Sequence, residues 1–171
     1  LMHGDHSIAR AEEVTTRVLQ ILFTTLREYK VDLSGVILKT SMVLAGDSHA
    51  VQTSPDEVAD ATLRTLRLTI PYEVAGIVYL SGGQTPVRAT ENLQAIQSRG
   101  PQPWKMTFSY SRALEEPVLA AWQGKEENKE KAQAALLHRL KMNSLAAQGK
   151  YSKDLRNKKT AHGRFFYFFS L

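Results

Sequence analysis

The sequence predicts an α/β fold in which short buried strands alternate with amphipathic helices. Three apolar runs of the kind that form buried strands end at Leu38, Leu80 and Phe108. Between them lie segments whose apolar residues recur every three to four positions, which is the period of a helix. Strands that alternate with helices form parallel sheets with right-handed crossover connections.

Start and stop signals bound the predicted helices. Ser54-Pro55-Asp56-Glu57 combines an N-cap, a proline at the first helical position and a capping box. Thr85-Pro86 opens another helix, which Gly100-Pro101 ends. The expected helices cover 8–29, 54–70, 85–99, 113–122 and 125–147, and the expected strands cover 35–38, 76–80 and 104–108.

Three strands do not close a barrel. The 171 residues suffice for one domain with a core, but a complete (β/α)₈ barrel takes about 250 residues. We therefore expect the last part of such a barrel, which opens with a helix whose preceding strand is absent. The alternative is a small open parallel sheet with helices on both faces.

Composition excludes several classes of protein. The chain has no cysteine, so disulfide frameworks and cysteine-based zinc sites are excluded. This composition is compatible with a protein of the reducing cytosol. No apolar run approaches the ~20 residues that span a bilayer, and no apolar signal core is visible. The excess of basic residues that gives the net charge of +5 lies after Gly149. The folded part therefore gives no argument for nucleic-acid binding.

Lys39 directly follows the first strand, Val36-Ile37-Leu38. Burial disfavours a charged amine, so we expect desolvation to lower the pKa of Lys39. A neutral amine forms Schiff bases with ketones, so Lys39 is a candidate nucleophile. The alternative is a lysine at the strand end that reaches solvent through its flexible stem.

A glycine-rich turn and an arginine predict an anion site. Ser81, Gly82 and Gly83 follow the second strand, and glycine backbones near a helix start can present N–H groups to an anion. Ser111 and Arg112 follow the third strand, and a guanidinium can hold a phosphate bidentately. Barrels often bind phosphate in the loops after their last two strands. The alternatives are an ordinary tight turn and a surface arginine paired with a glutamate one turn on.

The histidines do not predict a metal site. His3 and His6 flank Asp5, but all three lie in a terminal loop, and His49 and His138 have no partner at ligand spacing. We interpret Asp5-His6-Ser7 as a loop and helix cap.

The end of the chain differs from the rest. Residues 1–154 are expected to form the partial barrel domain, and residues 155–171 a basic and aromatic tail that is disordered or non-native. All five residues from Phe165 to Phe169 are aromatic. The alternative is a contact with a membrane or nucleic acid.

Taken in order, these motifs resemble class I fructose-bisphosphate aldolase. The resemblance runs from Leu1 to about Asp154 and rests on five segments. It implies a TIM barrel of which this chain holds strands six, seven and eight with their helices. The segments are Gly4-Asp5-His6, Leu38-Lys39-x-x-Met42-Val43, Leu80 to Gln84, Thr107 to Leu114 and Asn143 to Tyr151.

The resemblance implies roles for the residues already named. Lys39 matches the Schiff-base lysine, residues 81–83 match a phosphate-binding segment, and Arg112 matches an arginine that holds a phosphate. Ser111 stands where the family commonly has glycine. The implied reaction is the reversible cleavage of fructose 1,6-bisphosphate to dihydroxyacetone phosphate and glyceraldehyde 3-phosphate in glycolysis and gluconeogenesis.

The resemblance also implies the setting of this chemistry. It implies a lyase that needs no metal or other cofactor and takes a phosphorylated sugar as its substrate. Neither nucleic acid nor a membrane is an expected partner, and complete family members are often homo-oligomers. The implied location is the cytoplasm, or a plastid if the source is photosynthetic.

Three interpretations stay open. The family's acid–base glutamate lies on a Glu-Pro-Glu strand that is absent from this sequence, so we expect a fragment with little or no turnover. A non-catalytic interaction protein that uses its basic aromatic tail is a second interpretation. Another Schiff-base lyase on the same barrel is a third.

Overall fold

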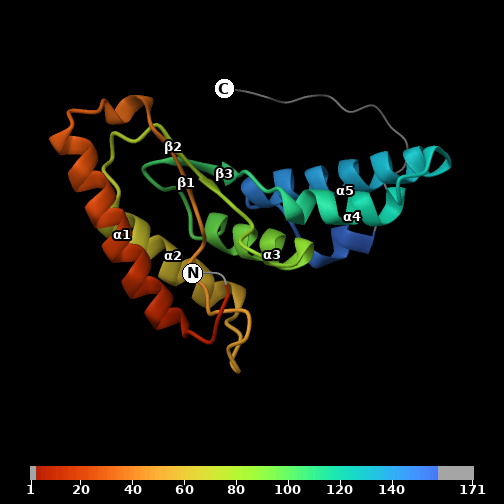
Figure 1. Ribbon diagram of the computed structural model, residues 1–171, viewed down its shortest axis with the longest axis horizontal. Coiled ribbons are helices and arrows are strands. Elements are labelled where there is room, and N and C mark those ends of the chain that lie inside the picture. The colour runs from red at the N-terminus through yellow and green to blue at the C-terminus, as the bar shows by residue number, and fades with distance from the viewer. Residues whose placement is uncertain (1–2, 158–171) are drawn as a thin grey trace.

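The computed structural model describes residues 3–157 and shows a parallel three-stranded sheet in the order β1–β2–β3. The predicted α/β class and parallel pairing are confirmed. Figure 1 shows α1 at one end of the molecule and the α4–α5 pair at the other. The strands are β1 (Ile37–Thr40), β2 (Gly76–Tyr79) and β3 (Lys105–Phe108), and the helices are α1 (Ile8–Glu28), α2 (Pro55–Thr69), α3 (Pro86–Gln97), α4 (Arg112–Trp122) and α5 (Lys129–Ala147).

Local capping chemistry explains where the helices begin. Ser7 caps α1 by accepting from the amide of Arg10, so the predicted helix cap is confirmed. At α2, the Ser54 hydroxyl accepts from the Glu57 amide, and the Glu57 carboxylate accepts from the Ser54 amide at 2.8 Å. Thr85 caps α3, and Pro86 opens it. These contacts satisfy amide donors that the first turn of a helix leaves unpaired.

The two faces of the sheet differ. Leu38 is buried on one face of β1, and its register neighbour Ile77 and the adjacent Tyr79 are fully buried on the same face. Side chains alternate between faces along a strand, so Ile37 and Lys39 point the other way. Ile37 is 65% exposed, and Lys39 is exposed as well. In the described part of the chain the core therefore lies on one side of the sheet, unlike the predicted alternative with helices on both faces.

The helices pack in a row against the covered face of the sheet. α1 contacts α2, α2 contacts α3, and α3 contacts α5, which pairs with α4. Among the described residues, β1 pairs only with β2, so its outer edge has no strand neighbour. This arrangement is that of a partial α/β barrel. No helix in the described chain is long and apolar enough to cross a membrane.

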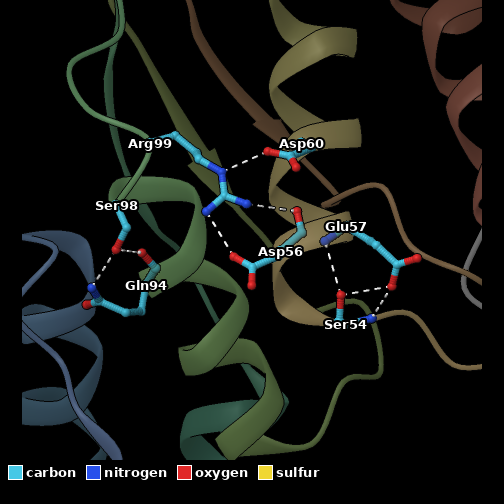
Figure 2. Close-up of polar contacts among 7 residues, drawn as sticks. All are labelled: Ser54, Asp56, Glu57, Asp60, Gln94, Ser98 and Arg99. Carbon is cyan, nitrogen blue, oxygen red and sulfur yellow. Dashed lines mark hydrogen bonds and ion pairs between the residues drawn. The ribbon is translucent and has the colours of Figure 1, made fainter.

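Figure 2 shows how the end of α3 is joined to the first turns of α2. Arg99 donates from Nε to Asp60 at 2.7 Å, and its Nη1 lies 2.9 Å from an Asp56 carboxylate oxygen. The hydrogen bond from Arg99 holds the pKa of Asp60 below its usual value. One guanidinium, just after the end of α3, thus contacts two carboxylates of the neighbouring helix α2.

Element boundaries depart from the expectations in a few places. β1 begins and ends two residues later than expected, so Lys39 lies inside the strand and not after it. Trp104, expected to open the third strand, precedes β3, and its indole N–H donates to the carbonyl of Pro71 at 2.8 Å. Residues 155–157 lie in a short 3₁₀-helix (Lys153–Asn157), and the rest of the predicted tail lies outside the described residues.

Removing the α2 cap tests the capping geometry. We expect Ser54→Ala to lower the free energy of unfolding by about 1 kcal/mol, because the Glu57 amide loses its acceptor. Urea unfolding followed by circular dichroism measures the change. Ser111→Ala is the matched control, since Ser111 occupies the N-cap of α4 without a capping bond. Equal losses in the two variants would contradict the role given to Ser54.

Candidate active site

The candidate site lies along the carboxyl edge of the sheet. The amide of Leu80 donates to Thr40 at 2.9 Å, and the amide of Ser109 donates to Tyr79 at 2.8 Å. Backbone pairing therefore continues one residue beyond β2 and β3. This pairing places the segments that follow β2 and β3 beside the end of β1, which carries Lys39.

Lys39 projects from the uncovered face of the sheet. In β1 the register partner of Lys39 is Val78, and Lys39 is exposed. The expected burial of Lys39 is therefore wrong for this structure, and the alternative of a lysine that reaches solvent is observed. Strand alternation puts the neighbours Leu38 and Thr40 on the opposite, covered face. Among the described residues, Lys39 makes no hydrogen bond or ion pair.

The glycine-rich segment forms a tight turn. The amide of Gln84 donates to the carbonyl of Ser81 at 3.0 Å, and Gly82 and Gly83 both have positive φ, at 57° and 79°. Two central residues with positive φ are typical of a type I′ turn, which glycine adopts without strain. Within the described chain, the amides of Gly82 and Gly83 donate to no other group. Two N–H donors are therefore available at this turn.

Arg112 lies next to this turn. It is the first residue of α4, and its Nη2 would lie 3.7 Å from a Cβ placed on Gly83. The structure thus brings together the predicted glycine turn and the predicted arginine. Glu115 accepts from the Ser111 hydroxyl at 3.0 Å, and Arg112 forms no ion pair with any described residue. The alternative of a surface arginine paired with a glutamate is therefore not observed here.

The predicted site residues form two groups in this structure. Gly82, Gly83 and Arg112 make a local cluster with Ser81, which is buried, and Ser111, which starts α4. Lys39 is linked to that cluster through the backbone pairing of Thr40 with Leu80. Among residues 3–157, no three histidine, aspartate or glutamate side chains gather as metal ligands would.

Two histidine–aspartate contacts had no signal in the sequence. His3 lies 2.6 Å from Asp47, and His49 lies 3.1 Å from Asp5. The hydrogen bond from His3 holds the pKa of Asp47 below its usual value. These contacts join the loop before α1 to the loop after β1, where Gly46 approaches the backbone so closely that a Cβ would collide with Gly4.

Comparison with known proteins identifies the family. A family model described as "Glycolytic: Fructose-bisphosphate aldolase class-I" matches residues 1–168. Fructose-bisphosphate aldolase 3, chloroplastic, from Arabidopsis thaliana is 46% identical over 165 residues, which is 96% of this chain and 42% of that protein. Fructose-bisphosphate aldolase B from Gallus gallus is 48% identical over 152 residues, which is 88% of this chain and 42% of that protein.

The fold comparison agrees. A solved structure of fructose-bisphosphate aldolase from Plasmodium falciparum, in complex with TRAP and a small-molecule inhibitor, superposes with a TM-score of 0.85 at 47% identity. That alignment covers 88% of this chain and 43% of the aldolase chain. The chain thus spans about two fifths of the length of the relatives it matches. With a family model matched along nearly its whole length, it belongs to the class I fructose-bisphosphate aldolase family.

Proposed function

We propose that this chain supplies the Schiff-base lysine and one phosphate site of a class I fructose-bisphosphate aldolase. In this proposal β1, β2 and β3 are strands six, seven and eight of the barrel. The observation that carries it is the approach of Arg112 to Gly83, at the sheet edge where the strand of Lys39 also ends. An arginine beside free backbone amides suits a phosphate, and a nearby amine suits the ketone of the same substrate.

The phosphate group would lie between the turn and α4. The amides of Gly82 and Gly83 and the guanidinium of Arg112 are donors from two different elements. The N-terminus of α4, which begins at Arg112, adds the positive end of a helix dipole. A phosphate held here would keep the rest of a sugar phosphate close to the edge of the sheet.

The proposed covalent step uses Lys39. Its neutral Nζ attacks the ketone carbon of fructose 1,6-bisphosphate or dihydroxyacetone phosphate and gives a carbinolamine. Loss of water then leaves an iminium between Nζ and the former ketone carbon. With fructose 1,6-bisphosphate, a base takes the proton of the C4 hydroxyl, the C3–C4 bond breaks and glyceraldehyde 3-phosphate leaves. The electron pair of that bond moves to the iminium and gives an enamine, so the cleavage needs no metal.

Turnover needs acid and base groups that this structure does not place beside Lys39. Positioned proton transfers typically contribute 10²–10⁴-fold to such steps. Within residues 3–157 the side chain of Lys39 has no hydrogen bond or ion pair with an acid or base, and its face of the sheet is uncovered. We therefore assign this chain substrate binding and the nucleophile, and expect complete turnover only in a closed barrel.

Reductive trapping tests the role of Lys39. With dihydroxyacetone phosphate and borohydride, we expect mass spectrometry to find one adduct on Lys39, formed about 10²-fold more slowly than in a complete class I aldolase. Lys39→Arg should abolish the adduct. Lys105→Arg is the matched control, because Lys105 is an exposed lysine on β3. Equal labelling of both lysines would remove the assigned nucleophile.

Phosphate titration tests the anion site. We expect inorganic phosphate to shift the amide resonances of Gly82 and Gly83, and Arg112→Ala to raise the dissociation constant about tenfold through loss of a charged donor. Arg10→Ala is the control, since Arg10 lies on α1 and pairs with Glu13. An unchanged dissociation constant in Arg112→Ala would place the phosphate elsewhere.

Complementation tests the function as a whole. A second polypeptide that holds the first three fifths of an aldolase barrel should restore cleavage of fructose 1,6-bisphosphate when mixed with this chain. The reason is that it would cover the face that carries Lys39 and pair with the free edge of β1. A coupled assay for glyceraldehyde 3-phosphate measures the activity. Restoration by Lys39→Arg as well as by the unaltered chain would contradict the proposal.

A further inference from the structure

Gln84 directly follows the glycine turn, and its side chain points into the protein. Only 7% of the residue is exposed. A buried amide is costly unless its polar atoms have partners, so its contacts define what it does. The amide of Gln84 already closes the turn by donating to Ser81.

The side chain of Gln84 contacts two elements at once. Its Oε1 accepts from Nδ2 of Asn92 at 2.6 Å, and its Nε2 lies 3.7 Å from the sulfur of Met42. Asn92 is fully buried in α3, two turns beyond the glycine turn. Met42 is also buried and comes three residues after Lys39.

The segment that carries Met42 is itself fixed. The amide of Val43 donates to Oγ1 of Thr62 in α2 at 2.9 Å, and this contact is buried. Gln84 therefore lies between a segment held by α2 and a side chain held by α3. A shift of the glycine turn along the sheet edge would break its bond to Asn92.

Asn92 has no second partner in the described chain. Its Oδ1 is buried without a hydrogen bond. Loss of Gln84 would therefore leave both polar atoms of Asn92 unpaired, which is more costly than losing both members of the pair. The two residues should behave as a coupled unit.

We propose that Gln84 is a positioning residue that, through Asn92 and Met42, holds the glycine turn in place relative to the strand of Lys39. The effect of this positioning on phosphate binding rests on the proposed function, in which a correctly placed turn presents the Gly82 and Gly83 amides to phosphate. Gln84 itself touches no substrate in this scheme. It acts through the backbone of residues 81–83.

Hydrogen exchange tests the positioning without any ligand. Gln84→Met preserves the length of the side chain but removes both polar atoms. We expect about tenfold faster exchange of the amide at position 84 and of the Leu80 amide, with α5 amides unchanged. Asn92→Leu should give the same local change, and the double variant should be no worse than either single variant. Unchanged local exchange, or an equal rise at all amides, would overturn the proposal.

Gln94→Met is the matched control. Gln94 lies on the same helix, but its side chain bonds Ser98 and the amide of Tyr151. We expect faster exchange at Tyr151 and none at position 84. A rise at position 84 in this control would mean that any loss of polar contacts along α3 loosens the turn, and the proposal would fail.

A phosphate titration then separates this inference from the proposed function. If the unaltered chain binds inorganic phosphate, Gln84→Met should raise the dissociation constant about tenfold, and Gln94→Met should not change it. Equal binding by Gln84→Met and the unaltered chain would overturn the positioning role. If the unaltered chain does not bind phosphate, the anion site is wrong, and the exchange data still decide whether Gln84 positions the turn.

Discussion

The two-residue period of β1 controls where the chemistry of this chain can lie. Leu38 and Thr40 pack toward the helices, so Ile37 and Lys39 must project from the other face. A slip of one residue would bury the lysine in the core and expose Leu38, which makes the register strongly specified. The pairing of Lys39 with Val78 then fixes which part of β2 lies beside the amine.

Hydrogen bonds between α5 and α3 hold the start of α3, which follows the carboxyl edge of the sheet. Arg139 is buried on α5, and its guanidinium donates to the carbonyl of Pro86 and to the hydroxyl of Thr90. Burial lowers the pKa of Arg139. Asn143 also bonds Thr90, at 2.5 Å. Since Pro86 opens α3, these contacts fix the helix start just after the glycine turn.

Features governed by neighbouring residues could be predicted from the sequence. The capping box at Ser54, the proline starts of α2 and α3, and the turn at Gly82 and Gly83 each depend on a few consecutive residues. The approach of Arg112 to Gly83 was also expected, because both follow neighbouring parallel strands. Contacts between distant residues had no such signal: Gln84 meets Met42, and His49 meets Asp5, only after the chain has folded.

Of the two environments predicted for Lys39, the buried one is wrong and the exposed one is observed, because the burial of a strand depends on other segments. An apolar run before a lysine indicates a strand with at least one buried face. Whether the face that carries the lysine is also covered depends on other segments of the protein. The cluster of Gly83 and Arg112 needs just two adjacent strand–helix units, and both lie within this chain. Desolvation of Lys39 needs side chains from across the sheet face, and none of the described residues provides them. The proposed binding and covalent roles therefore depend on different parts of a barrel: the phosphate donors assemble locally, whereas a closed pocket around Lys39 requires that the open face be covered.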